Sequence, residues 1–297
     1  MTRHRYDGCL TYLRNELAQF VRDVKDAGVG LWHDRAAQIV IALALLPWLA
    51  TLAVRRDLNI LNSLAQIGGV IFIYWFFTRR QPFAPLPVRR PIIESALCLS
   101  FVAVWMLYRL GEYLRLIVFP PLHCAACGDL METIVPKTIE MVVAPLVLFL
   151  ALRYSLRQLG LGWPVRAWLP ALLPLGGLLY WGLNHQTLAA LLTRTFCFYL
   201  GAGLPEELMF RGFVQSRLEV LTKRPAWGIF LGGFVFGVSH LPIDLHGTGW
   251  ANWPNALETA FTYQMGVGLA LGVAFQRAHN LWPLTLIHAL IDAAPLM

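Results

Sequence analysis

The sequence places two adjacent carboxylates and an arginine inside an apolar stretch. Glu206, Glu207 and Arg211 lie in the run Gly203–Phe213, which apolar residues flank on both sides. Pro205 lacks a backbone donor and should loosen the helix just before them. Glu207 and Arg211 are four residues apart and can pair on one helical face, whereas Glu206 points elsewhere. Glu206 is therefore the freer acid, and a buried carboxylate of this kind can act as a general base.

Two later stretches each carry a histidine four residues from a second polar or aromatic residue. Phe236 precedes His240, and His288 precedes Asp292, so the members of each pair share one face of a helix. The Phe236 ring would wall the site, and the Asp292 carboxylate would orient the His288 imidazole. At 1.5 Å per residue, Glu206, His240 and His288 lie ~14–21 Å from the same side of a bilayer. Three helices at matching depth predict one shared site.

The composition indicates that these helices lie in a membrane. The chain has 297 residues, of which 57% are hydrophobic and only 14% are charged. Soluble domains have about 25% charged residues, so a disordered chain and a soluble enzyme are both excluded. We predict an all-α, polytopic transmembrane helix bundle of about eight or nine spans. The spans are expected near 36–54, 58–77, 91–110, 139–152, 167–183, 195–216, 226–241, 255–275 and 279–296.

The positions of basic residues predict the orientation of the chain. Most of the 24 Lys and Arg residues fall on the side of the N-terminus, and basic residues favour the cytoplasmic side. Six are expected on the opposite side: Arg55, Arg56, Arg109, Arg115, Lys137 and Arg194. We therefore predict an integral membrane protein with a cytoplasmic N-terminus. The Ala-, Leu- and Arg-rich composition and the compact loops suit a bacterial inner membrane. The net charge of +7 reflects this topology, and we expect no nucleic acid partner.

Three segments are predicted along the chain. Residues 1–35 alternate charged and apolar side chains and should form an amphipathic helix on the inner leaflet. Residues 36–90 would form a two-span extension with a proline-rich linker, and residues 91–297 the catalytic core. Four charged residues lie near predicted span ends, where either side chains that reach the headgroups or a small error in the span boundary accounts for them. They are Glu94, Arg109, Glu140 and Glu258.

One pair of cysteines has a spacing that could carry chemistry. Cys124 and Cys127 form a C-x-x-C pattern in a segment expected on the outer side. The pattern is compatible with a disulfide, a redox pair or half of a metal site. The sequence leaves these three readings open.

The ordered motifs resemble the CPBP intramembrane protease family, also called the CAAX protease and bacteriocin-processing or Abi family. The motifs are E-E-x-x-x-R from Glu206 to Arg211, F-x-x-x-H from Phe236 to His240, and H-x-x-x-D from His288 to Asp292. The resemblance covers about residues 195–296. It implies a membrane-bound protease that hydrolyses a peptide bond near the embedded or C-terminal end of a membrane-anchored protein or peptide.

The resemblance also implies a role for each residue. Glu206 with His240 would activate the attacking water, and His288 with Asp292 would stabilise the oxyanion. The supporting residues would be Glu207, Arg211 and Phe236. The resemblance implies no metal cofactor, although Glu206, His240 and His288 are also a ligand set for Zn²⁺. The family commonly has Asn where this chain has Asp292, and an ionised Asp cannot donate a hydrogen bond.

Other classes of protein could use the same residues. A transporter could use buried Glu, Arg and His, but it would usually show broken helices in both halves, and only Pro205 marks one here. A non-catalytic membrane immunity or scaffold protein would keep the bundle without needing Glu206. A thiol-redox protein would depend on Cys124 and Cys127 alone.

Overall fold

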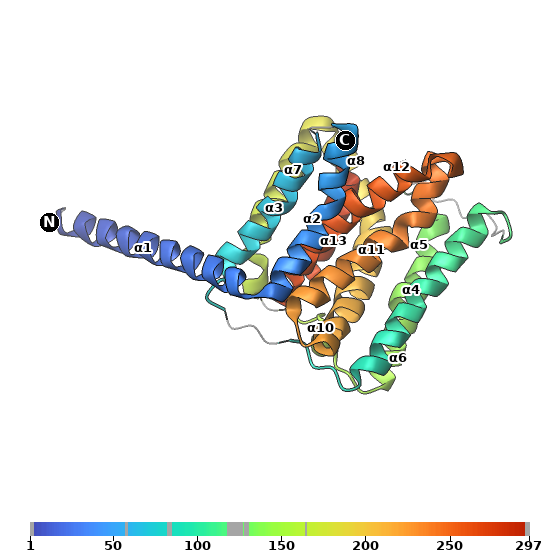
Figure 1. The fold of residues 1–297 in the computed structure, drawn as a ribbon, viewed down its shortest axis with the longest axis horizontal. Coiled ribbons are helices and arrows are strands. Elements are labelled where there is room, and N and C mark those ends of the chain that lie inside the picture. Colours follow the sequence, from blue (N-terminus) through green and yellow to red (C-terminus); the bar gives the residue numbers. More distant parts are fainter. Residues whose placement is uncertain are drawn as a thin grey trace. The chain divides into compact units, whose positions relative to one another are not determined.

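The structure is a computed structural model that describes residues 3–56, 59–81, 85–117, 127, 131–163 and 165–294. These residues form helices and connecting turns, and no β-strand occurs among them. They divide into two compact units, residues 1–46 and 47–297, which are described separately. Figure 1 shows the helices in chain order. The predicted all-α bundle is confirmed, while the predicted boundary between an extension and a catalytic core stays a prediction.

The first unit contains a long amphipathic helix. Helix α1 (Arg3–His33) carries Leu17, Val21 and Val24 at spacings of three or four residues, and all three side chains are exposed. A helix with an exposed apolar stripe is suited to lie on a membrane surface. The predicted helix is present, and its position on the inner leaflet stays a prediction.

Six helical segments of the described residues are long and apolar enough to cross a membrane. They are Arg35–Arg55 (α2), Ile60–Thr78 in α3 (Asn59–Thr78), Pro91–Tyr113 (α4), Ile134–Ala151, Leu188–Thr222 and Pro225–Thr248 (α11). Each overlaps a predicted span. Helices α7 (Leu172–His185) and α14 (Trp282–Ala293) have 14 and 12 residues, below the ~20 that a bilayer requires. The number of eight or nine spans therefore stays a prediction.

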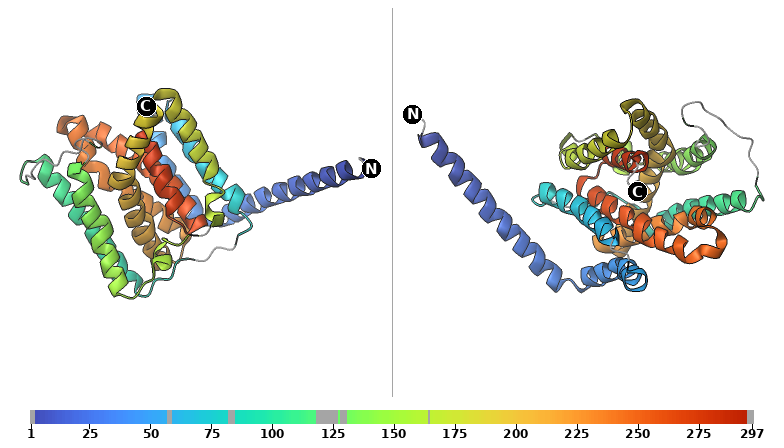
Figure 2. Two further views of the ribbon diagram at one scale, coloured as in Figure 1. Left: turned by 180° about the vertical axis from the view of Figure 1, so that it is seen from behind. Right: turned by 90° about the horizontal axis from the view of Figure 1, so that it is seen from above.

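The remaining elements form the segment Ile134–Ala151 and the parts of the chain between the long helices. They are α5 (Met131–Thr138), η1 (Ile139–Val143), α6 (Ala144–Ala151), η2 (Leu156–Leu159), η3 (Val165–Trp168), η6 (Trp250–Asn252), α12 (Trp253–Glu258), η7 (Thr259–Gln264) and α13 (Met265–Ala278). Helix α11 packs along α13, α13 packs along α3, and α14 packs against α7 and α8 (Figure 2).

The winding of the run Leu188–Thr222 changes around the acidic motif. It consists of α8 (Leu188–Phe198), η4 (Tyr199–Gly203), α9 (Leu204–Glu207), η5 (Leu208–Gln215) and α10 (Ser216–Thr222), of which η4 and η5 are π-helical. Pro205 has no N–H to bond to the carbonyl of Gly201. The N–H of Leu204 bonds instead to the carbonyl of Tyr199, five residues back. The predicted loosening before Pro205 thus takes the form of a wide turn, which is frequent at functional sites.

Two glycines allow the helices around this turn to approach closely. A Cβ at Gly203 would collide with the carbonyl oxygen of Thr285 on α14, so only glycine fits there. His288 lies one turn after Thr285, so this contact brings it to the acidic motif. A Cβ at Gly237 on α11 would lie 2.5 Å from the carbonyl oxygen of Ala260 on η7. In hydrocarbon, such close packing is a main source of helix association.

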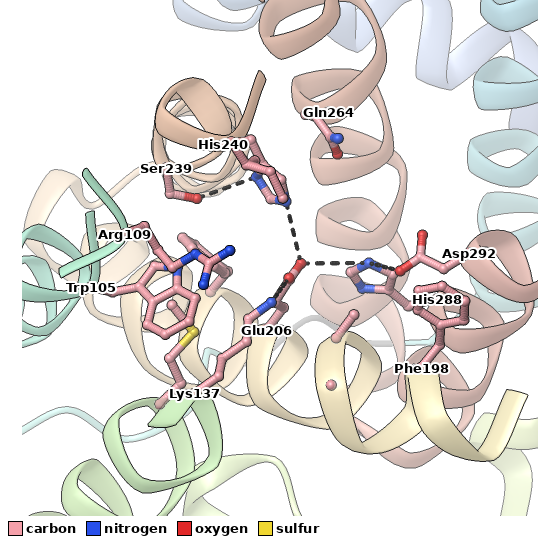
Figure 3. A pocket seen from close by; sticks show the side chains of 15 residues that line it. Trp105, Arg109, Lys137, Phe198, Glu206, Ser239, His240, Gln264, His288 and Asp292 are labelled. Carbon is pink, nitrogen blue, oxygen red and sulfur yellow. Dashed lines mark hydrogen bonds and ion pairs between the residues drawn. The ribbon is translucent and has the colours of Figure 1, made fainter. Parts of the chain in front are cut away.

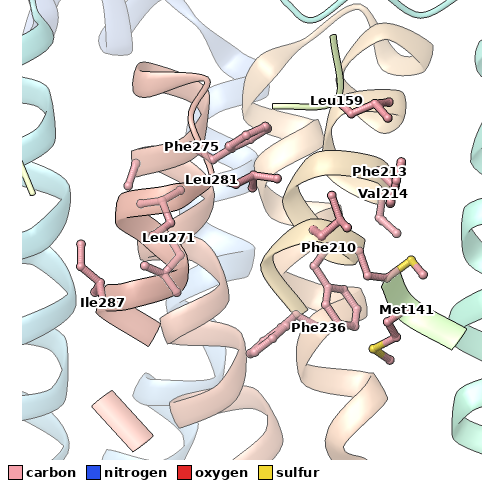
Figure 4. Packing of buried hydrophobic residues seen from close by; sticks show 14 of the residues in the cluster. Met141, Leu159, Phe210, Phe213, Val214, Phe236, Leu271, Phe275, Leu281 and Ile287 are labelled. Atoms are coloured by element: carbon pink, nitrogen blue, oxygen red, sulfur yellow. The ribbon is translucent and has the colours of Figure 1, made fainter. Parts of the chain in front are cut away.

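A large apolar core packs between the helices that carry the motifs, and Figure 4 shows part of it. The rings of Phe210 and Phe236 meet edge to face with centroids 5.0 Å apart, and Phe149 stacks on Phe213 at 4.7 Å. All four side chains are almost completely buried. Dense packing of this kind holds the helices that carry the motifs in one arrangement.

A buried ion pair links α10 to α4. Arg217 is fully buried, and its Nε lies 3.3 Å from Oε2 of Glu94. The hydroxyl of Tyr154 donates to Oε1 of the same carboxylate at 2.8 Å. The interpretation of Glu94 as a residue that reaches the headgroups is therefore wrong, because its side chain is paired inside the bundle.

A disulfide joins Cys127 to Cys197 on α8. It links the segment before α5 to the helical run that carries the acidic motif. Cys124 lies outside the described residues. Of the three readings left open for the C-x-x-C pattern, Cys127 thus forms a disulfide, but with a partner far away in the sequence.

Candidate active site

Three helices bring Glu206, His240 and His288 together (Figure 3). Oε2 of Glu206 lies 3.7 Å from Nε2 of His240 and 3.6 Å from Nε2 of His288. Glu206 and His288 are each 4% exposed. The separations exceed a direct hydrogen bond and suit a water that contacts all three atoms. The structure therefore places the carboxylate oxygen opposite two imidazole nitrogens.

The imidazole of His240 is held in a defined tautomer. Its Nδ1 lies 2.8 Å from the carbonyl oxygen of Phe236, and a carbonyl can only accept. Nδ1 therefore donates, and Nε2 of the neutral ring presents its lone pair toward Glu206. The Phe236 ring lies 4.6 Å from the His240 ring and 5.9 Å from the His288 ring. Phe236 thus walls both imidazoles.

Glu207 orients the second imidazole. Its Oε1 lies 2.7 Å from Nδ1 of His288 and 3.1 Å from Nη1 of Arg211. The pairing of Glu207 with Arg211 that the spacing predicted is thus present. Oδ2 of Asp292 lies 3.7 Å from Nε2 of His288, which is too far for a hydrogen bond. The expectation that Asp292 orients His288 is therefore not met, because Glu207 holds the ring from its other nitrogen.

The segment that carries these residues matches a family model. Residues 188–294 match the model described as Rce1-like, type II CAAX prenyl endopeptidase. This segment is therefore similar to the CAAX protease family. The match spans a little over a third of the chain and includes all three motifs, so the resemblance is confirmed. The chain matches no curated protein and no solved structure.

Similarity to the CAAX protease family, together with the apolar helices, supports an integral membrane protein and a membrane protease. Residues of the matched segment 188–294 line a cavity of about 240 Å³. Its polar lining consists of Arg109, Lys137, Glu206, Ser239, His240, Gln264, His288 and Asp292. A second cavity of about 320 Å³, between α3, α7, α13 and α14, has no carboxylate or imidazole in its lining. Of these two cavities, the first has the carboxylate and imidazole groups that hydrolysis requires.

Two basic residues that were expected on the outer side of the membrane line the first cavity. Lys137 on α5 is 8% exposed, and its Nζ forms an ion pair with Oε1 of Glu206. Arg109 on α4 lines the same cavity. Sequence reasoning missed Lys137 because the helix begins at Met131 rather than near 139. No motif marks this lysine, and only an earlier helix start could have indicated it.

Glu206, His240 and His288 fit a divalent metal ion poorly as a set of ligands. The ammonium of Lys137 is bound to Oε1 of Glu206 and would repel a second cation at the same carboxylate. Within the part of the chain that the structure describes, no group of three or more His, Cys, Asp and Glu side chains is arranged to hold a metal ion.

The carboxylate of Asp292 lines the cavity at the position where the family commonly has Asn. Asp292→Asn is expected to keep kcat within about threefold, because the amide is of similar size and can donate a hydrogen bond. Asp292→Ala removes every polar atom there and should lower kcat by at least about tenfold. Peptide hydrolysis by the purified variants measures both effects. Full activity of Asp292→Ala would remove Asp292 from the mechanism.

Proposed function

We propose that this protein is an intramembrane endopeptidase that hydrolyses a peptide bond of a membrane-anchored protein or peptide, near its embedded or C-terminal end. The observation that carries the proposal is the convergence of Glu206 Oε2 with Nε2 of His240 and His288 in a buried cavity. The match to CAAX prenyl endopeptidases supports the same class of reaction.

In the proposed attack, one water lies between Glu206 and His240. It donates one hydrogen bond to Oε2 of Glu206 and the other to Nε2 of His240, whose lone pair faces that oxygen. Glu206 takes a proton as the water oxygen bonds to the carbonyl carbon, and a carbonyl electron pair moves to oxygen. Glu206 is thus the general base, and His240 positions and polarises the water.

His288 stabilises the oxyanion that forms in this step. Its Nδ1 donates to Glu207, so Nε2 can donate to the oxyanion when the ring carries both protons. The carboxylates of Glu206, Glu207 and Asp292 surround the ring and balance its charge. The intermediate then collapses, and the amine leaves with the proton that Glu206 received. The products are a new carboxylate and a free amine.

We also propose that the protein lies in a bacterial inner membrane with its N-terminus on the cytoplasmic side. The turns after α3 and α6 carry Arg79, Arg80, Arg89, Arg90, Arg153 and Arg157 on the predicted inner side. Basic residues concentrate on the cytoplasmic side of short loops. Cys127 lies in the connection on the predicted outer side, and its disulfide is of the kind that persists in an oxidising compartment such as the periplasm.

A hydrolysis assay with two synthetic peptides tests the proposed function. One peptide ends in a farnesylated cysteine followed by three residues, and the other has the same sequence with an unmodified cysteine. In ¹⁸O-labelled water, the purified protein should release a C-terminal fragment and leave one ¹⁸O in the new carboxylate. Added hydroxylamine should yield no hydroxamate, because water attacks directly. Hydroxamate formation, or no cleavage of either peptide, would contradict the proposal.

The same assay tests whether the reaction depends on a metal. Dialysis against 1,10-phenanthroline should leave the rate unchanged, and the purified protein should contain zinc well below one atom per chain. Stoichiometric zinc, with activity lost on dialysis and restored by zinc, would overturn the metal-free mechanism while leaving the peptidase assignment in place.

A further inference from the structure

Lys137 belongs to none of the three motifs, yet its ammonium contacts the proposed base. It lies on α5, with a side chain 9% exposed, and its Nζ donates to Oε1 of Glu206 (Figure 3). The ring of Trp105 on α4 lies 5.6 Å from Nζ, so an aromatic face covers the ammonium on another side. Lys137 therefore places a positive charge inside the candidate active site.

Two features of the fold hold Lys137 there. Helix α5 packs closely on η4, where a Cβ at Gly201 would lie 3.1 Å from Cγ1 of Ile134, one turn before Lys137. The disulfide between Cys127 and Cys197 ties the segment before α5 to the residue that precedes Phe198 of the cavity wall. The lysine is therefore attached to the same helical run as the base, by packing and by a covalent link.

The other cations near the site have different partners. Arg211 is paired with Glu207, and Arg109, which also lines the cavity, is paired within its own helix. Among the described residues, Lys137 is the Lys or Arg side chain that forms an ion pair with Glu206. The other partners of the Glu206 carboxylate are the imidazoles of His240 and His288.

The two oxygens of the Glu206 carboxylate consequently have different surroundings. Oε1 is bound to the ammonium of Lys137, while Oε2 faces the imidazoles of His240 and His288 and has no hydrogen bond within the protein. A carboxylate held at one oxygen cannot rotate freely, so the other oxygen keeps its direction.

We propose, resting on the peptidase function above, that Lys137 is a positioning residue of the hydrolytic site. It holds Oε1 so that Oε2 takes the proton of the attacking water. When Glu206 becomes neutral in that step, the ammonium remains in the cavity with no counter-charge of its own. Its charge then stabilises the oxyanion that forms at the same moment.

The first test compares two replacements of Lys137 in the peptide assay. Lys137→Met keeps the length without the charge and should lower kcat by about 10²-fold while KM changes less than about threefold. Lys137→Arg keeps the charge and should recover at least a tenth of the wild-type kcat. Lys223→Met, at the exposed end of α10, is the matched control and should behave as wild type. Full kcat in Lys137→Met, or equal losses in the Arg and Met variants, would overturn the proposal.

The second test measures the ion pair independently of catalysis. Lys137→Met should lower the melting temperature in detergent, because it leaves a buried carboxylate without its cation. The same change in a Glu206→Gln background should lower it much less. Equal shifts in both backgrounds would contradict the pairing. Retained peptidase activity in Glu206→Gln would instead remove Glu206 as the base. Cleavage of neither peptide by the wild-type protein would overturn the proposed function, so these failures are distinguishable.

Discussion

Glu206→Gln is expected to lower kcat for peptide hydrolysis by about 10³-fold. The amide keeps the size of the side chain but cannot take a proton from water. Folding should survive, because the amide oxygen still accepts a hydrogen bond from the ammonium of Lys137. The peptide assay measures kcat, and thermal unfolding in detergent verifies that the variant is folded.

Glu219 provides a matched control for this change. It lies on the same helical run and is 5% exposed, but it does not line the cavity. Its Oε1 accepts a hydrogen bond from Nε2 of Gln215 at 3.1 Å, which a Gln at 219 can preserve. Glu219→Gln should therefore keep activity. A folded Glu206→Gln variant that still cleaves peptide would remove Glu206 from its role as base.

Arg211→Met is expected to destabilise the protein by about 3–5 kcal/mol and to abolish hydrolysis. Arg211 is 1% exposed and Glu207 is fully buried. The guanidinium also donates to the carbonyl oxygen of Gly268 at 3.4 Å and lies 4.6 Å over the Phe236 ring. Without it, the buried carboxylate of Glu207 keeps its contact with Nδ1 of His288 but has no Lys or Arg beside it among the described residues. Stability and the orientation of the imidazole should both be lost.

Thermal unfolding in detergent measures the loss of stability. Arg166→Met serves as the control, because Arg166 is an exposed residue of η3. A second change separates the effect of the unpaired charge from the loss of the imidazole orientation. Glu207→Gln in the Arg211→Met background removes the unpaired charge and should recover part of the stability without restoring full kcat. An unchanged melting temperature in Arg211→Met would show that the buried pair does not stabilise the fold.

The sequence alone was sufficient to predict the helices. Each of the six membrane-spanning candidates overlaps a predicted span, because long apolar runs bounded by charges or prolines leave few alternatives to a helix in a bilayer. Contacts within one helix were predictable for a similar reason. Glu207 pairs with Arg211, and Phe236 packs on His240, because residues four apart share a face at any position of the helix.

The depth of the residues in the bilayer predicted the meeting of the three side chains but not the partner of His288. Glu206, His240 and His288 do meet, because residues at equal depth on neighbouring helices can approach each other. The partner of His288 was not predictable in the same way. Glu207 binds its Nδ1 while Asp292 stays beyond hydrogen-bond distance, and this depends on how each helix is rotated about its axis.

What the sequence by itself determined is therefore the helical class, the approximate spans and the side chains of the three motifs, since these follow from local periodicity and hydropathy. Only the tertiary structure decided the pairing of Lys137 with Glu206, of Glu94 with Arg217 and the disulfide of Cys127. Each joins residues at least 69 positions apart. Such contacts depend on where a helix begins and which neighbour it packs against, and close packing of many side chains sets both.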